Sequence, residues 1–453
     1  MFFILLSLNG CKLDKVKKKG KYADFEEIKE KGELNILTLS GSMSYFIYKG
    51  EPRGYEYELA KSFADEHNLK LNVKVAHNVT SLNHMLLNSE GDLIAYNIPV
   101  TYEGKDSLLY TGREIINHQI LVQRADKEDT ILKDVTELIG KEVWVMNDSK
   151  YYDRLVNLND ELGGGIKIQT INKDTVTVED LIEMVSKGQI SHTVSEDDLA
   201  RLNKTYFRNI DVSLNISHPQ RSSWAVRHSS PGLAEAINRW FDENQNKSQY
   251  RSIVKRYFEM SKLPGDEPAP ILGPGMISPY DEYFKEYAEK INWDWRLLAS
   301  IAYQESKFYT DRVSWAGATG LMGLMPRTAE AMGISQAETF LPEPSIKAAT
   351  ELIRRLNKAF SNIEDENEKI KFVLAAYNAG SGHVYDGQAL AKKYGKDPKI
   401  WKGHVEESLK LKQLPEYYND PVVKQGYFRS RETISYVQNV LERWEYYKEQ
   451  VNN

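Results

Sequence analysis

The stretch from Trp293 to Ala329, WDWRLLASIAYQESKFYTDRVSWAGATGLMGLMPRTA, determines how the C-terminal part of this chain folds. Its first half carries apolar residues at spacings of three and four, which predicts an amphipathic helix over residues 295–308. Asp294 is a suitable N-cap, because a short acidic side chain accepts hydrogen bonds from the first helical amides. Glu305 is the one charged residue on the apolar face that Leu298, Ile301, Ala302 and Phe308 form.

A carboxyl group on an apolar face suits one kind of chemistry. Such a group loses hydration, which disfavours its ionised form. A carboxylic acid that stays protonated can donate its proton to a glycosidic oxygen. The alternative is a structural glutamate at the rim of the face, because most charged helical side chains stay in contact with water.

Three further motifs follow Glu305 and Ser306. The segment SWAGATGLMG, residues 314–323, has glycines that predict a loop whose backbone passes close to another group, and Pro326 suits the start of a new helix. The segment AAYNAG, residues 375–380, ends an apolar helical run. Tyr436 lies in the late segment ETISYVQNV.

In order and spacing these four motifs resemble the goose-type-lysozyme-like lytic transglycosylases of bacteria. The resemblance implies that Glu305 is the catalytic residue, that Met322 and Tyr377 pack on sugar faces, and that Tyr436 lies near the acetamido group or Glu305. The full set of implied substrate-binding residues is Ser306, Ser314, Gly320, Leu321, Met322, Tyr377, Asn378 and Tyr436. Gly323 departs from the pattern, since the family usually has Gln there.

Composition limits the class of protein. The chain has 453 residues, 27% of them charged and 41% hydrophobic, with a formal net charge of −6. Its length predicts several globular units, and its mild charge predicts no nucleic-acid partner. The sequence has no apolar run long enough to cross a bilayer. It has no cluster of metal-ligand spacing, so we expect no metal and no cofactor.

The N-terminal part predicts an α/β domain over residues 32–260. Strands are expected at residues 34–38, 71–75, 93–98, 120–124 and 142–146, with an amphipathic helix at 55–69, and their alternation predicts a mainly parallel sheet. The segments GELNILT, GYEYELA and SWAVR resemble the extracellular solute-binding proteins of the amino-acid-binding type, which implies two lobes joined by two crossings. The crossings are expected near residues 119–123 and 219–223.

The linker and the second domain follow. Residues 261–279 contain five prolines and three glycines, which marks an interdomain linker. Residues 280–453 are predicted to form a mainly α, lysozyme-like domain, with an irregular polar insertion over residues 386–427. His383, beside the AYNAG motif, is interpreted as a cap or surface residue.

The N-terminal domain departs from amino-acid binders at the ligand. Those proteins usually hold the ligand carboxylate with Arg in a T-x-x-R motif, whereas here Thr101 is followed by Gly104 and Lys105. Lysine lacks the planar fork that binds a carboxylate through two hydrogen bonds. Glu196 is a candidate contact to a ligand ammonium group, with a solvated helix start as the alternative. A muropeptide is therefore a better candidate ligand than a free amino acid.

Cys11 is the sole cysteine and ends the run MFFILLSLNGC, which looks like a bacterial lipoprotein signal. Residues 1–11 would be the signal and residues 12–31 a polar tether. The apolar run is short for a signal, so we expect translation to start upstream of Met1. A lipid on Cys11 would anchor the protein in the periplasm at the outer membrane.

The whole chain resembles the membrane-bound lytic murein transglycosylase F family, which joins a solute-binding-like domain to a transglycosylase domain. The resemblance implies cleavage of the β-1,4 bond between N-acetylmuramic acid and N-acetylglucosamine with a 1,6-anhydromuramic product, and glycan strands as the partner. Two alternatives remain at this point. One is a muramidase, a hydrolase of the same fold. The other is a cell-wall sensor whose helical domain only binds glycan.

Overall fold

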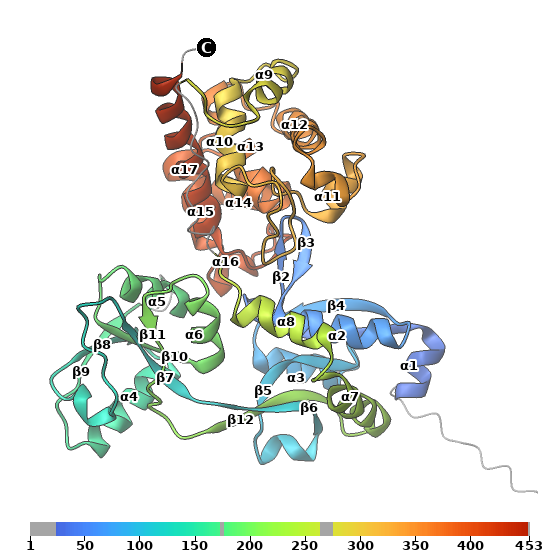
Figure 1. The fold of residues 1–453 in the computed structure, drawn as a ribbon. Helices are drawn as coiled ribbons and strands as arrows, with labels where there is room; N and C mark the ends of the chain where they lie inside the picture. The colour runs from blue at the N-terminus through green and yellow to red at the C-terminus, as the bar shows by residue number, and fades with distance from the viewer. Residues whose placement is uncertain (1–23, 173–175, 263–274, 452–453) are drawn as a thin grey trace, which may run out of the picture.

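The computed structural model describes residues 24–172, 176–262 and 275–451. Cys11, the first part of the predicted tether and residues 263–274 of the predicted linker lie outside these ranges. Two sheet-containing lobes and a helical domain make up the described part of the chain (Figure 1).

The first lobe is built on a five-stranded sheet in the order β4-β1-β5-β12-β6. Strand β1 pairs in parallel with β4 and β5, while β12 runs antiparallel to β5 and β6. The strands are β1 (Glu33–Leu39), β4 (Lys70–Ala76), β5 (Leu93–Pro99), β6 (Leu108–Asn117) and β12 (Gln220–Arg227). The helices of this lobe are α1 (Phe25–Lys31), α2 (Tyr55–Glu66), α3 (Val79–Leu87), α7 (Pro231–Asn244) and α8 (Ser248–Phe258), with the short turn η1 (Glu103–Asp106).

The second lobe has its own five-stranded sheet, in the order β11-β7-β10-β8-β9. Its strands are β7 (Gln119–Arg124), β8 (Glu142–Met146), β9 (Lys167–Ile171), β10 (His192–Glu196) and β11 (Ile210–Asp211). Its helices are α4 (Lys150–Glu161), α5 (Val178–Ser186) and α6 (Asp197–Lys204), with the turn η2 (Val135–Leu138). The chain enters this lobe between β6 and β7 and returns before β12, so two crossings join the lobes.

The predicted strands and helix are confirmed, but the sheets are less parallel than expected. Strands β8, β9 and β10 are parallel, whereas β7 runs antiparallel to β10. The reason lies in the two crossings. The strand that follows each crossing, β7 in the second lobe and β12 in the first, runs opposite to the parallel strands of its sheet.

The helical domain packs around the helix that the opening stretch predicted. Helix α10 (Trp295–Ser306) lies in the core, and Leu298, Ile301 and Ala302 are fully buried. The surrounding helices are α9 (Asp281–Glu289), α11 (Pro326–Ala331), α12 (Pro342–Ala359), α13 (Glu366–Ala379), α14 (Ser381–Lys393), α15 (Glu406–Leu411), α16 (Pro415–Tyr418) and α17 (Ser430–Gln450), with the turns η3 (Ala337–Phe340) and η4 (Trp401–Val405).

Helix α10 ends two residues earlier than predicted. Lys307 and Phe308 have positive φ angles of 52° and 68°, and the Lys307 amide donates to the carbonyl of Tyr303. This left-handed turn is uncommon for residues other than glycine. It turns the chain out of the helix and into the loop that surrounds Glu305, while the buried Phe308 packs beside Phe284.

The expected irregular insertion over residues 386–427 is wrong. This segment contains the end of α14, then η4, α15 and α16. Leu390, Val405 and Leu409 are fully buried, so sparse apolar positions hold the segment on the core. Pro415 occupies the first turn of α16, where a proline starts a helix instead of breaking one.

A β-hairpin joins the first lobe to the helical domain. Strands β2 (Phe46–Tyr48) and β3 (Glu51–Arg53) are connected by Lys49 and Gly50, whose φ angles are 48° and 79°. Two successive positive φ angles give the tight turn whose twist matches paired strands. Figure 1 shows this hairpin leaving the first lobe and reaching among the helices of the second domain.

Candidate active site in the helical domain

Glu305 lies in the last turn of α10, under the loop that follows the helix. Its side chain is only 9% exposed. A Cβ atom placed on Gly323 would lie 2.1 Å from Oε2 of Glu305, and Gly323 has a φ angle of 59°. The Glu305 carboxylate can therefore occupy this position only because residue 323 has no side chain.

Ser306 secures the loop over the helix end. Its hydroxyl group is buried and donates to the carbonyl oxygens of Ala302 and Leu321, at 3.0 Å and 2.8 Å. In this conformation the hydroxyl is directed into the protein, and the expected contact of Ser306 with substrate stays a prediction. Its role here is to hold the loop against α10.

Other loop residues have similar internal roles. The Ser314 hydroxyl accepts a hydrogen bond from the Ala318 amide. Gly320 has a φ angle of 79° and lies against the Thr339 carbonyl, where a Cβ atom would come within 1.8 Å. The Leu321 and Met322 side chains are fully buried in the core. Both side chains face inward in this conformation, and the contact of Met322 with a sugar face stays a prediction.

Two tyrosines complete the surroundings of Glu305. The Tyr377 hydroxyl donates to the Met322 carbonyl over 2.7 Å, which places its ring under the loop. Tyr436, on α17, is buried beside Glu305, and burial together with the charge of Glu305 raises the pKa of Tyr436. Residues 131 positions apart thus meet at one carboxylate because α17 packs along α10. Asn378 accepts a hydrogen bond from Thr433 and lines a small cavity together with Tyr48 and Lys49.

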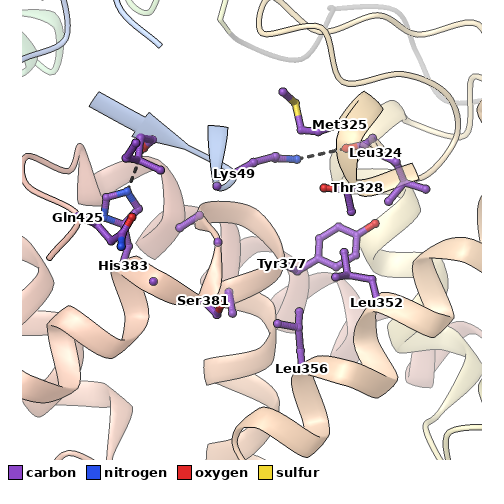
Figure 2. A pocket seen from close by; sticks show the side chains of 17 residues that line it. Lys49, Leu324, Met325, Thr328, Leu352, Leu356, Tyr377, Ser381, His383 and Gln425 are labelled. Carbon is purple, nitrogen blue, oxygen red and sulfur yellow. Dashed lines mark hydrogen bonds between the residues drawn. The ribbon is translucent and has the colours of Figure 1, made fainter. Parts of the chain in front are cut away.

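The hairpin of the first lobe fills the space in front of Glu305. Lys49 Nζ lies 3.1 Å and 3.3 Å from the two carboxylate oxygens of Glu305 and 3.4 Å from the Gly323 carbonyl. Figure 2 shows the Lys49 side chain extending from the hairpin above Tyr377. A cavity of about 230 Å³ remains between the hairpin, the loop and helices α12 to α14.

Further contacts hold the hairpin in this position. The Ile47 carbonyl faces His383 Nε2 at 2.9 Å, and Arg53 donates to the Ala316 carbonyl over 2.8 Å. Trp315 of the loop is 7% exposed and packs beside Tyr48, with ring centroids 5.1 Å apart. The loop around the candidate active site therefore contributes its indole ring to the core of the first lobe.

The second lobe binds the helical domain through charges. Glu179, on α5, accepts hydrogen bonds from Tyr427 and from Ser42 of the first lobe, and it forms an ion pair with Arg429. Arg431 forms ion pairs with Asp180 and Glu183 of the same helix. Helix α5 is thus connected to both other parts of the structure.

The two candidate ligand residues of the two-lobed domain, Thr101 and Glu196, have separate partners and do not form a shared binding site in this conformation. Thr101 is exposed and accepts a hydrogen bond from the Gly104 amide. Glu196 forms an ion pair with Lys150 at the start of α4. Acidic groups that sequence reasoning missed lie nearby: burial raises the pKa of Asp198 to about 6 and that of Glu56 to about 8.

The sequence did not reveal Lys49, and its interpretation of His383 as a cap or surface residue is wrong, because His383 is 1% exposed and lines the cavity. Neither has a local signal, because their partners come from another domain. Within the part of the chain that the structure describes, no cluster of His, Cys, Asp and Glu could hold a metal ion. Among the same residues, every helix is too short or too polar to cross a bilayer.

Comparison with known proteins agrees with this division. The family of bacterial extracellular solute-binding proteins, family 3, matches residues 36–260, and the transglycosylase SLT domain matches residues 282–400. The chain is 32% identical to the membrane-bound lytic murein transglycosylase F of Desulfosudis oleivorans, over 93% of this chain and 91% of that protein. It is 30% identical to the protein of the same name from Pseudomonas fluorescens, over 96% and 87%. With a solute-binding domain, an SLT domain and relatives that match along nearly its whole length, this chain belongs to the membrane-bound lytic murein transglycosylase F family.

Proposed function

We propose that this protein is a lytic transglycosylase of murein whose two-lobed domain regulates access to Glu305. Glu305 carries the proposal. It is a single carboxyl group at the end of a buried helix, covered by a loop and beside Tyr436, within a chain of the lytic murein transglycosylase F family. Peptidoglycan glycan strands are the proposed substrate.

One carboxyl group suffices for the proposed reaction. Glu305 donates its proton to the oxygen of the β-1,4 bond as the bond to the N-acetylmuramic anomeric carbon breaks, and the acetamido group of that sugar assists. The 6-hydroxyl of the same sugar then attacks the anomeric carbon and returns its proton to Glu305. A 1,6-anhydro bond forms and no water is consumed. Tyr436 is the proposed neighbour of the acetamido group.

The same position argues against a hydrolase with two carboxylates. Asp311 is the only other acid between Glu305 and Glu330, and it is exposed in the turn after α10. In a glycosidase of that type the second carboxylate faces the opposite side of the sugar ring. A residue just past the same helix is poorly placed for that role.

The test is digestion of purified murein followed by mass spectrometry of the products. We expect 1,6-anhydromuramic ends, a loss of at least about 100-fold in rate for Glu305→Gln, and retained activity for Asp311→Asn. Reducing ends as the main product, together with an inactive Asp311→Asn variant, would make the protein a muramidase. Binding of murein without any cleavage would make it a sensor.

The regulatory part of the proposal rests on the hairpin. Lys49 occupies the position in front of Glu305 where a glycosidic oxygen has to lie, so the conformation described here is inactive. Activity requires the hairpin to withdraw. Strands β2 and β3 belong to the first lobe, and Glu179 of the second lobe contacts both the first lobe and the helical domain. A ligand that moves the lobes therefore changes access to Glu305.

The proposed regulatory ligand is a muropeptide. The T-x-x-R guanidinium of amino-acid binders is replaced by Gly104 and Lys105. The acidic residues Glu196 and Asp198 of the second lobe lie near Tyr96 of the first, which favours a ligand with ammonium groups. Calorimetry of the full-length protein with muropeptides and with free amino acids tests this. Micromolar affinity for a free amino acid would contradict it.

The location follows from Cys11. We propose that a lipid on Cys11 anchors the protein to the outer membrane, with both domains in the periplasm, and that the chain between Cys11 and α1 serves as the tether. The expected end of the tether at residue 31 is wrong, because residues 25–31 form α1 and Ile28 is buried in the core of the first lobe. In Cys11→Ser the protein should move from the membrane fraction to the soluble fraction and keep its activity on isolated murein. Unchanged fractionation would exclude this anchor.

A further inference from the structure

A buried cluster beside the candidate active site has no part in the chemistry described above. It consists of Lys412, His383 and Asp386, which are 0%, 1% and 3% exposed. Lys412 Nζ lies 2.6 Å from His383 Nδ1 and 2.6 Å from Asp386 Oδ2. Asp386 in turn accepts the backbone amides of Lys424 and Gln425, at 2.8 Å and 2.9 Å.

These contacts fix the protonation of the His383 ring. A lysine ammonium group can only donate, so Nδ1 of His383 must accept. The group opposite Nε2 is the Ile47 carbonyl, which can only accept, so Nε2 carries the hydrogen. Burial, followed by the charge of Lys412, lowers the pKa of His383 well below its usual value and keeps the ring neutral. The ring also stacks on Phe428, with centroids 4.3 Å apart, so its direction is fixed.

The donor at Nε2 faces the pocket that the hairpin occupies. His383 lines the same cavity as Lys49, Gly323 and Tyr377, and Figure 2 shows its ring beneath the hairpin. Its acceptor, Ile47, belongs to the other domain and stands two residues before Lys49. When the hairpin withdraws, the N–H group loses this acceptor, and a buried donor without a partner costs about 1–3 kcal/mol. Water can replace this acceptor while the pocket is open, so the cost falls on a ligand that displaces the water without offering an acceptor of its own.

We propose that His383 binds an amide carbonyl of the murein strand, in the place that the Ile47 carbonyl takes in the inactive conformation. An amide carbonyl is the same chemical group as the backbone carbonyl that the ring binds now. Murein offers this group in the N-acetyl substituents of its sugars and in its stem peptides. This inference rests on the proposed function, and it makes the hairpin backbone a mimic of the substrate at His383 as well as a block at Glu305.

The test uses full-length protein in which Lys49→Met has weakened the hairpin block. In this background His383→Phe keeps a ring on Phe428 but removes the N–H donor, while His383→Gln offers an amide N–H in its place. We expect His383→Phe to raise KM for murein about tenfold with kcat within about twofold, as loss of one hydrogen bond predicts. His383→Gln should stay within about threefold of the background. His404→Phe, in η4 and outside the pocket, is the matched control and should leave KM unchanged.

A purely structural role predicts the opposite result. If His383 only held the hairpin through Ile47, both His383 variants would have a KM equal to or below that of the background. That outcome overturns the proposal, as does an equal rise of KM in His383→Phe and His383→Gln. Thermal melting of each variant shows whether the fold is intact. If the Lys49→Met background itself releases no anhydro products, the proposed function has failed, irrespective of His383.

Two substrates separate the two sources of the carbonyl. One is murein with its stem peptides, and the other is glycan stripped of peptides by an amidase. A rise of KM on both substrates assigns the N-acetyl group to His383, whereas a rise on intact murein alone assigns the stem peptide. Each result supports binding of an amide carbonyl, and a KM that does not change on either substrate contradicts it.

Discussion

Lys49 Nζ lies 3.1 Å from Oε2 of Glu305, although 256 residues separate the two in the sequence. Both side chains are less than 10% exposed, so the ion pair is shielded from solvent. In such surroundings, removal of one partner leaves the other charge buried and unpaired, which is strongly destabilising. The pair therefore favours the conformation in which the hairpin covers the candidate catalytic residue.

Lys49→Met should raise the basal rate of murein cleavage. The substitution keeps the apolar stem of the side chain but removes the ammonium group, so Glu305 loses its partner only in the covered conformation. We expect the rate without added ligand to rise at least about tenfold, a change of about 1.4 kcal/mol. Lys61→Met on α2, whose ion pair with Asp65 is exposed, is the control and should leave the rate unchanged. An unchanged rate in Lys49→Met would show that the hairpin does not limit activity.

Arg431→Ala should also release the helical domain, but to a smaller extent. Its ion pairs with Asp180 and Glu183 join α17 to α5 of the second lobe, and the Arg431 side chain is 35% exposed. Pairs of this exposure contribute up to about 1 kcal/mol, so we expect a rise in basal rate of about fivefold or less. Arg354→Ala, whose partner Glu351 lies on the same helix, is the control. Equal rates in both variants would exclude a role of α5 in holding the domains together.

Gly323→Ala should destabilise the helical domain more than Gly333→Ala. Both glycines have positive φ angles, where alanine costs about 1–2 kcal/mol. The space at Gly333 is open, whereas a Cβ atom at position 323 would lie 2.1 Å from the Glu305 carboxylate. Calorimetric melting measures the difference between the two variants. In a Glu305→Ala background the difference should shrink but not vanish, because the Cβ atom of residue 305 stays 3.0 Å from the added methyl group. An undiminished difference would show that the Glu305 carboxylate is not its main cause.

The stability of the two-lobed domain should fall as pH rises from about 5 to 8. Glu56 is 4% exposed, and burial raises its folded-state pKa to about 8 despite hydrogen bonds from Trp224 and Asn97. The unfolded value is about 4.3, so between these values the folded state binds more protons and loses stability with increasing pH. Melting temperatures across this range test the sign.

Glu56→Gln is the variant that isolates this effect. Its amide cannot ionise, so the Glu56 contribution to the slope of stability against pH should vanish. The NH₂ group would face one of the two donors that now bind the carboxyl, so the variant should also be less stable at pH 5. A slope equal to that of the unsubstituted protein would place the titrating group elsewhere, for example at Asp198, whose pKa burial raises to about 6.

The sequence determined the local elements and the division into domains. The spacing of apolar residues predicted α10, and Asp294 caps it as expected, by accepting a hydrogen bond from the Arg296 amide. The alternation of strands and helices predicted the two-lobed domain, and the order of motifs around Glu305 predicted the family. These features could be predicted from the sequence because each depends on residues that lie close together in the chain. The prediction for residues 386–427 was wrong because this segment depends on contacts with distant residues. Its few apolar side chains, Leu390, Val405 and Leu409, stabilise it only by packing on the core.

Only the tertiary structure decided which groups face Glu305 and which face inward. Ser306 and Met322 carry motif positions, yet their side chains are buried because the loop folds back on α10. Lys49 and His383 gained their roles from the packing of one domain against the other. A charged or polar side chain of this kind has no local pattern, because its environment is made by residues hundreds of positions away. The sequence thus predicted Glu305 as the candidate catalytic residue, whereas the proposed control of access to Glu305 depends on the contact between the hairpin of one domain and the pocket of the other.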